Sequence, residues 1–320
     1  MTSRRTRTWA ALLTLLAAML VVAAGCGGDD DSAATEGNST AGAAAQPGEG
    51  KPPITIGTKD FAEEYILGEL YGQALEAKGY SVQLKHSIGS TEIIDKALTS
   101  GKIDAYPEYT GETVSSAFAQ DFIAKSAEEM TSRAKELYAG RGQVTSEPTP
   151  FQDKDAIITL KEFAAQHGLT TVADLKKLGS FSLAGQAPFK GRFAGVKGME
   201  KIYGIRNVEF KAITPGLQYK ALDRGDVDTA DAFTTDPQLS SDRYTILEDT
   251  KGVFGFQNVL FVINKPKYEA LGGQQFMDII NSVNKLLTEP AMRAMNEAVL
   301  TDKKEPAAVA EAFLQANGLV

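Results

Sequence analysis

The sequence contains one cysteine, two histidines and one tryptophan, and each scarcity excludes a class of function. A disulfide needs two cysteines, so Cys26 alone provides neither a disulfide framework nor a thiol nucleophile in the body of the protein. His86 and His167 lack metal-ligand spacing, and no Gly-x-Ser-x-Gly or phosphate-loop motif occurs. The sequence therefore predicts no metal, no cofactor, no catalytic residue and no enzymatic activity.

A block of basic residues is also lacking. The chain has 33 Lys and Arg against 41 Asp and Glu, and three of the arginines lie within the first seven residues. Nucleic-acid binding requires a concentrated basic surface, so this composition argues against a nucleic-acid partner.

The N-terminus has the pattern of an export signal. Arg4, Arg5 and Arg7 precede an apolar run over 9–24, which ends in the small residues before Cys26. The run is shorter than the roughly 20 residues that a membrane-spanning helix needs. Its end resembles a bacterial lipobox, although Ala23 stands where Leu or Val is usual. We expect a signal peptide at 1–25 and a lipid on Cys26; the alternative is a plain signal peptide with an incidental cysteine.

A segment of small and acidic residues follows the expected lipidation site. Residues 27–53 are rich in Gly, Ala, Ser, Thr and acids and contain no large apolar side chain. Such a segment cannot bury enough surface to offset its ordering entropy. The sequence predicts a disordered tether over 26–53 that holds the protein on the outer face of the cell membrane.

Strands and helices alternate from residue 54 to residue 320. Asp60 and Glu63 stand in capping-box positions, and Thr214 is expected to cap a later helix with Pro215 in its first turn. The alternation is typical of an α/β architecture with a mostly parallel sheet. The expected strands are 54–57, 82–85, 103–106, 181–184, 208–211 and 260–263, and the expected helices are 61–77, 90–98, 195–203, 214 onward, 274–287 and 306–315.

An internal echo divides this region into two similar halves. The segment 96–104, Lys-Ala-Leu-x-x-Gly-x-Ile-Asp, returns at 220–228 as Lys-Ala-Leu-x-x-Gly-x-Val-Asp. Each copy leads to an aromatic residue and a threonine, Tyr109-Thr110 and Phe233-Thr234. Ligands of α/β proteins bind beyond the carboxyl ends of strands, so the echo predicts a cleft with one wall from each half. The alternative is a chance match of common helix-end residues.

Several long motifs resemble one protein family. They are Gly-Thr-Lys-Asp-Phe-Ala-Glu-Glu-Tyr-Ile-Leu-Gly at 57–68, Gly-Ser-Thr-Glu at 89–92, and Tyr-Pro-Glu-Tyr-Thr-Gly at 106–111. Residues 231–236 and 305–314 match as well. The chain from 54 to 320 is similar to the glycine betaine/carnitine/choline-binding lipoproteins of ABC osmoprotectant importers.

The resemblance implies a two-lobed fold of the type II periplasmic binding proteins. Each lobe would contain a mixed, mostly parallel sheet flanked by helices, with the ligand cleft between the lobes. We expect 54–157 plus 264–320 in lobe 1 and 158–263 in lobe 2, with crossovers near 157–159 and 261–264. The expected function is that of a monomeric substrate-binding protein that delivers its solute to an ABC permease driven by an ATPase.

The resemblance also implies a site in which aromatic faces attract a trimethylammonium group. Tyr109 and Phe233 fit two such positions, whereas Asp155 and Val196 stand where aromatic residues are usual; Phe61, Phe189 and Phe193 could replace the missing rings or be core or loop residues. Lys59 and Arg192 are expected to pair with an anionic group, and Asp155 and Glu112 either face the ligand or lie at the solvated rim. The expected ligand-binding residues are Lys59, Phe61, Thr91, Tyr109, Glu112, Asp155, Arg192, Phe233, Thr234 and Asp236.

Two other functions stay open at this point. The cleft could bind a different zwitterionic or amine solute, because a carboxylate at Asp155 would be best satisfied by a cation that donates hydrogen bonds. Alternatively, the protein could be an extracytoplasmic sensor that reports its ligand to a signalling partner. An acid/base set of Asp104, Glu108 and Glu112 is conceivable, but the strand pattern makes Asp104 structural.

Overall fold

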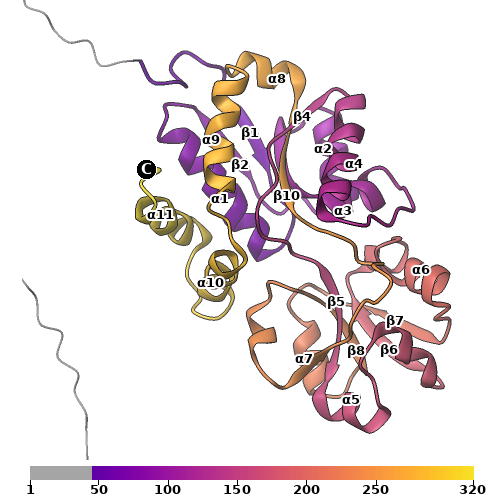
Figure 1. Cartoon of the computed structure of the whole chain (residues 1–320). Helices are drawn as coiled ribbons and strands as arrows, with labels where there is room; N and C mark the ends of the chain where they lie inside the picture. The colour runs from indigo at the N-terminus through magenta and orange to yellow at the C-terminus, as the bar shows by residue number, and fades with distance from the viewer. Residues whose placement is uncertain (1–44) are drawn as a thin grey trace, which may run out of the picture. The chain divides into compact units, whose positions relative to one another are not determined.

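The computed structural model describes residues 45–320, which form two lobes (Figure 1). The expected signal peptide, Cys26 and the tether as far as residue 44 lie outside the described residues. Over 45–320, no helix combines the length and apolar character needed to cross a membrane. Residues 47–50 form turns against the body, where the Gly48 N–H donates to the Lys78 carbonyl at 2.9 Å. The last part of the expected tether therefore contacts the folded protein.

The first lobe is built on a mixed sheet with the strand order β2-β1-β3-β10-β4. β1 pairs in parallel with β2 and β3, whereas β10 runs antiparallel to β3 and β4. The strands are β1 (Ile54–Gly57), β2 (Val82–Lys85), β3 (Ala105–Tyr109), β4 (Gln143–Thr145) and β10 (Val259–Asn264).

Helices cover both faces of this sheet. One face packs Ile56 and Phe261 against α1 and α9, and the other packs Leu260 and Val262 against α2 and α4. The alternation of side chains along β10 thus serves two separate apolar cores. The helices are α1 (Ala62–Glu76), α2 (Thr91–Thr99), α3 (Thr110–Glu112), α4 (Ala127–Gly140), α8 (Lys265–Ala270), α9 (Gln274–Asn284), α10 (Glu289–Leu300) and α11 (Pro306–Ala316), with a π-helical turn at Thr113–Ala117.

The second lobe repeats the same sheet topology in the order β7-β6-β8-β5-β9. Its strands are β5 (Asp155–Leu160), β6 (Phe181–Gly185), β7 (Val208–Ala212), β8 (Thr229–Phe233) and β9 (Tyr244–Ile246). Its helical segments are α5 (Lys161–His167), α6 (Val196–Gly198) and α7 (Gln218–Asp223), with 3₁₀ turns at Val172–Lys177, Ala187–Lys190 and Pro237–Ser240 and a π-helical turn at Met199–Tyr203. The expected α/β fold with two mixed, helix-flanked sheets is confirmed.

The internal echo corresponds to equivalent positions in the two sheets. Gly101 and Gly225 both adopt a positive φ, 71° and 72°, after helices α2 and α7. The carboxylate of Asp104 accepts a hydrogen bond from the neighbouring strand at Thr55 N, and that of Asp228 does the same at Ser182 N. Both aspartates are therefore structural, and the two chain copies place Tyr109 and Phe233 at the ends of matching strands.

Three local predictions from the sequence differ from the structure. α1 begins after Phe61 with no side-chain cap, so Asp60 and Glu63 do not form a capping box. Thr214 does not cap α7, which begins after Leu217. The chain crosses between the sheets just before β5 and just before β10, so 157–159 and 261–264 are strands that follow the crossings.

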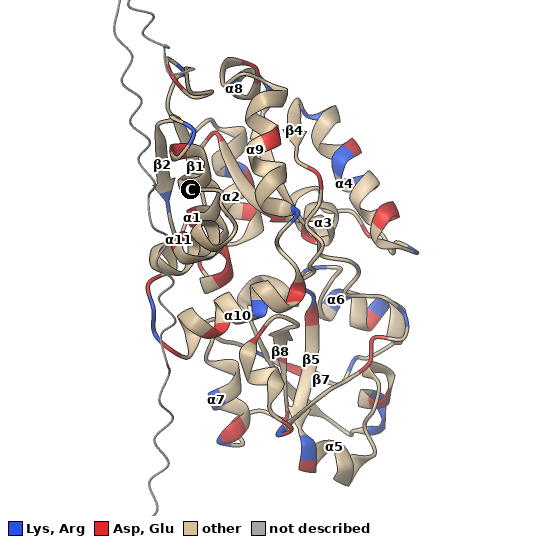
Figure 2. Ribbon diagram, turned by 60° about the vertical axis from the view of Figure 1, so that its left-hand side comes forward, with Lys and Arg blue, Asp and Glu red and all other residues tan. Residues whose placement is uncertain are grey.

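Charged residues of both signs are interspersed over the helices of both lobes (Figure 2). This distribution agrees with the absence of basic blocks in the sequence. Any charge-based recognition must therefore come from a local arrangement of side chains.

Candidate ligand-binding site

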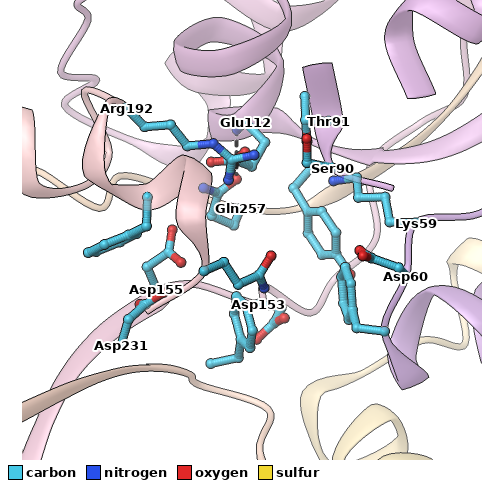
Figure 3. A pocket seen from close by; sticks show the side chains of 15 residues that line it. Lys59, Asp60, Ser90, Thr91, Glu112, Asp153, Asp155, Arg192, Asp231 and Gln257 are labelled. Atoms are coloured by element: carbon cyan, nitrogen blue, oxygen red, sulfur yellow. Dashed lines mark hydrogen bonds and ion pairs between the residues drawn. The ribbon is translucent and has the colours of Figure 1, made fainter. Parts of the chain in front are cut away.

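A cleft of about 510 Å³, open solvent at its mouth included, lies where the carboxyl ends of β3 and β8 meet (Figure 3). Thr234 and Asp236 do not line it. The sequence-predicted residues that line it are Lys59, Phe61, Thr91, Tyr109, Glu112, Asp155, Arg192 and Phe233.

Several lining residues were not predicted as ligand contacts. Asp231 could have been found, because it precedes Phe233 by two residues on β8 and so shares its face. Gln257 had no such signal: its side chain packs against Gly111, where a Cβ would lie 2.8 Å from the amide, and accepts from Glu112 N at 3.1 Å. The other additional lining residues are Asp60, Ser90, Asp153, Gln186 and Phe189.

Lys59 is buried and already ion-paired. Its Nζ bonds to Glu108 and lies 4.5 Å from the centre of the Tyr109 ring. Burial by itself lowers the pKa of Lys59, but the nearby carboxylates, led by that of Glu108, outweigh burial and raise the pKa. The positive charge of Lys59 is thus largely neutralised by carboxylates of lobe 1.

Arg192 connects the two lobes. Its Nε and Nη2 each lie 3.0 Å from a carboxylate oxygen of Glu92, and its Nη1 lies 2.7 Å from Glu112 Oε2. Burial lowers the pKa of Arg192, but Glu112 and Glu92 together raise it. Figure 3 shows the guanidinium directed at Glu112. The sequence predicts that Arg192 pairs with an anionic group of the ligand. In this structure, Arg192 instead pairs with glutamates of the opposite lobe.

Two aspartates on adjacent strands form a carboxyl pair. Asp155 and Asp231 lie diagonally opposite each other on β5 and β8, and both line the cleft. Burial, followed by repulsion from Glu112, raises the pKa of Asp155 to about 7. Burial and the charge of Asp155 also raise the pKa of Asp231. Both carboxyls therefore hold their protons to a higher pH than an aspartic acid in water does.

Neither Asp155 nor Glu112 is a solvated rim charge. Asp155 is 9% exposed and Glu112 is 7% exposed. Asp231 Oδ1 has no hydrogen-bond partner among residues 45–320. A buried carboxyl oxygen without a donor is costly, so this end of the cleft favours an occupant that donates a hydrogen bond.

Three aromatic rings form a stack in the wall of the cleft. Phe61 lies 5.7 Å from Phe233 with an interplanar angle of 9°, and 6.2 Å from Tyr109 with an angle of 26°. Phe61 therefore stands between the rings that the echo predicted to face each other. Phe189 also lines the cleft, whereas Phe193 is buried outside it. Val196, where an aromatic residue is usual in the family, does not line the cleft.

Tyr109 is held by a network that includes both lobes. Its hydroxyl donates to Glu63 Oε1 at 2.8 Å, and Glu63 Oε2 accepts from Thr235 Oγ1 at 2.6 Å and from Asn296 Nδ2 at 2.7 Å. Asp236, near this network, instead accepts from the hydroxyl of Tyr219 at 2.8 Å. Glu63, taken for a capping residue in the sequence, is a structural link between α1, α10 and lobe 2.

The remaining expected residues are Thr91, which lies at the opposite end of the cleft, and Thr234, which lies beside the point where the chain crosses between the lobes. Thr91 is buried at the start of α2, and its hydroxyl has no partner among the described residues. Thr234 Oγ1 accepts from Lys154 N at 2.9 Å beside the crossing. Within 45–320, no group of three or more His, Cys, Asp or Glu is arranged to hold a metal ion.

Comparisons with known proteins agree with this architecture. The sequence model of a family described as the substrate-binding domain of ABC-type glycine betaine transport systems matches residues 52–316. A glycine-betaine-binding protein from Pseudomonas aeruginosa is 30% identical over 282 residues, which cover 83% of this chain and 88% of the relative.

A second relative carries a different substrate name. An ergothioneine transport permease/ergothioneine binding protein, EgtU, from Helicobacter pylori is 27% identical over 277 residues. The match covers 83% of this chain but 48% of that longer protein.

A solved structure described as a glycine betaine/carnitine/choline ABC transporter superposes with a TM-score of 0.66 at 22% identity, covering 83% of this chain and 99% of that one. This likeness establishes the type II periplasmic-binding fold. The family consists of transporter binding proteins, so the expectation that the chain is not an enzyme is confirmed. The chain belongs to the family of substrate-binding domains of ABC-type glycine betaine transport systems.

Proposed function

We propose that this protein captures a small organic cation of the glycine betaine, choline or carnitine type and delivers it to an ABC permease. The observation that carries the proposal is the surplus of acidic side chains around the aromatic stack. Five acidic residues line the cleft against two basic ones, and both bases are already paired with glutamates. Burial raises the pKa of Asp153, Asp155 and Asp231, so these carboxyls hold protons that a bound cation would displace.

The two ends of the cleft differ in character, which suits a zwitterion. Thr91, the start of α2 and the Lys59 ammonium lie at one end, and Asp155 and Asp231 lie at the other (Figure 3). A ligand carboxylate is best placed at the Thr91 end, where the hydroxyl lacks a partner and the helix N-terminus favours negative charge. The cationic group then lies between the aspartates and the rings.

An amine with N–H donors is the second candidate. It is favoured by Asp231 Oδ1, which a fully methylated ammonium cannot satisfy and an N–H group can. The relative named for ergothioneine adds one further ligand for comparison with glycine betaine.

Calorimetric titration of the unliganded protein distinguishes these candidates. The panel is choline, glycine betaine, carnitine, ergothioneine and the mono- and dimethylated analogues of betaine. Saturable binding of at least one of these compounds is the expected result; failure of all of them, with binding of a solely anionic solute, would refute the proposal. Mass spectrometry of molecules that co-purify with the protein provides an independent identification.

We also propose that residues 1–25 are removed and that Cys26 anchors the protein by a lipid on the outer face of the membrane. Cys26→Ser should release the protein from the membrane fraction, because serine cannot carry the diacyl-type anchor that we propose as the attachment to the membrane. Fractionation and immunoblotting, with Ser32→Ala as a matched control in the same segment, measure the release. Membrane association that persists in Cys26→Ser would contradict the anchor.

The aromatic stack makes a prediction that separates binding from stability. Phe233→Ala should weaken cation binding by about 0.5–2 kcal/mol, the range of a partly desolvated cation–π contact. Tyr109→Ala should also lower the free energy of unfolding by about 3–5 kcal/mol, because Tyr109 is 3% exposed and belongs to the core of lobe 1. Titration and thermal unfolding of both variants test this. Full retention of cation binding in Phe233→Ala would show that the Phe233 ring does not contribute to the binding site.

A further inference from the structure

A second cavity adjoins the cleft on the far side of the aromatic stack. Its volume, open solvent included, is about 1030 Å³. Asp60, Phe61, Asp153 and Phe233 line both cavities, so these residues form a shared partition. The other walls come from the N-terminus of α1, the region 215–219 before and within α7, the segment 235–238 after β8, and α10 with the residues after it.

The polar lining of this cavity offers acceptors without donors. Gln218 and Asn296 are buried, and the side-chain oxygens of both, as well as Gln238 Oε1, have no hydrogen-bond partner among the described residues. Asn296 has its amide nitrogen engaged by Glu63 and the Thr235 carbonyl, which leaves only its oxygen available. Buried acceptors of this kind are normally satisfied, so their presence here indicates a place for donors from a bound molecule.

The same cavity also has an apolar edge. Leu217 has 48% of its surface exposed although it is a large aliphatic residue, and it lines the cavity together with Leu300 and Tyr65. A combination of apolar surface with a few convergent polar groups is typical of a small-molecule site.

We propose that this second cavity is a tail compartment for a solute longer than glycine betaine. The inference rests on the proposed function: the cationic group occupies the acidic cleft, and the tail passes Phe61 and Phe233 into the second cavity. The ligand class is an elongated organic cation whose tail combines an apolar segment with N–H or O–H donors. Gln218 and Asn296 accept from those donors, and Leu217 contacts the apolar segment.

The test compares short and long cations on variants of residues that line the second cavity and do not line the cleft. Leu217→Trp narrows the compartment, and Gln218→Met removes an unpartnered acceptor at nearly constant volume. Choline serves as the short probe; carnitine, ergothioneine and an N-(ω-hydroxyalkyl)trimethylammonium series serve as the longer probes. Ile246→Trp is the matched control, because Ile246 is exposed to a similar extent, 47%, and lines neither cavity.

In the wild-type protein, affinity should rise with tail length to at least tenfold above choline for the best probe. Leu217→Trp should remove that gain, Gln218→Met should reduce it for donor-bearing tails, and both should leave the Kd of choline within twofold. Equal effects on choline and the long probes, or no effect on either, would overturn the tail compartment while leaving cation binding intact. If the wild-type protein binds no cation, the proposed function fails, and the tail compartment fails with it.

Discussion

Asp155→Asn should make the unliganded protein more stable at pH 8 while weakening its binding of cations. Burial and Glu112 raise the pKa of Asp155 to about 7, well above its value in the unfolded chain. The folded state therefore holds a proton that the unfolded state releases, and stability falls as the pH rises from about 4 to about 7. Asparagine removes that loss and can donate to Asp231.

The expected gain is about 2 kcal/mol at pH 8 and close to zero at pH 4, because one pKa unit corresponds to about 1.4 kcal/mol and the coupled pair shares the effect. For a protein of this size, such a gain raises Tm by roughly 4–8 °C. Choline affinity should fall about tenfold or more, since one of the carboxylates facing the cation is lost. Stability and function would thus oppose each other at this position.

Thermal unfolding at both pH values and titration with choline measure these effects. Asp60→Asn is the matched control, because Asp60 also borders the cleft but is exposed to solvent. A loss of stability in Asp155→Asn at pH 8 would contradict the account, since it would make the aspartate a required structural partner.

Arg192→Ala should weaken binding of every cation by about 100-fold or more. The substitution leaves Glu112 buried among other carboxylates without its partner, an arrangement that costs roughly 3–5 kcal/mol. It also removes the contacts to Glu92 and Glu112 that join the lobes, so the variant should populate a more open form. Small-angle X-ray scattering should then show a larger radius of gyration than in the wild-type protein.

A comparison of choline with glycine betaine distinguishes two possible roles of Arg192. If Arg192 joins the lobes, choline and glycine betaine lose affinity equally; if it binds a ligand carboxylate, betaine loses far more than choline. Lys161→Ala provides the control, because the pair of Lys161 and Asp242 is solvent-exposed and contributes little. A selective loss of betaine binding would restore the role that the sequence first suggested for Arg192.

The strands and the echo could be predicted because they depend on local patterns. Short apolar segments located β1, β6 and β10, and the repeated Gly and Asp located the turn and strand that end in Tyr109 and Phe233. The two-residue period of a strand would also have identified Asp231 from Phe233. α10 was missed, although Thr288 caps it and a proline follows in its first turn.

The pairing of charges could not be predicted, because it depends on contacts between residues far apart in the sequence. Arg192 and Glu92 are 100 positions apart, and Glu63 receives hydrogen bonds from residues 46, 172 and 233 positions away. Local sequence assigned Glu63 to a capping box, and tertiary contacts placed it in the network around Tyr109. Which charges in the cleft are free, and which are already paired, became clear only from the fold.

The central claim is that the acidic, aromatic cleft binds an organic cation, and calorimetric titration of choline into the unliganded wild-type protein tests it most directly. Choline is the most informative ligand for this test, because it has no carboxylate and its charge does not change with pH. The account predicts saturable one-to-one binding at pH 8 that weakens by about tenfold at pH 6, because the cation must displace the proton that Asp155 takes up as the pH falls through its pKa of about 7. Absence of choline binding at both pH values, or affinity that increases as the pH falls, would contradict it.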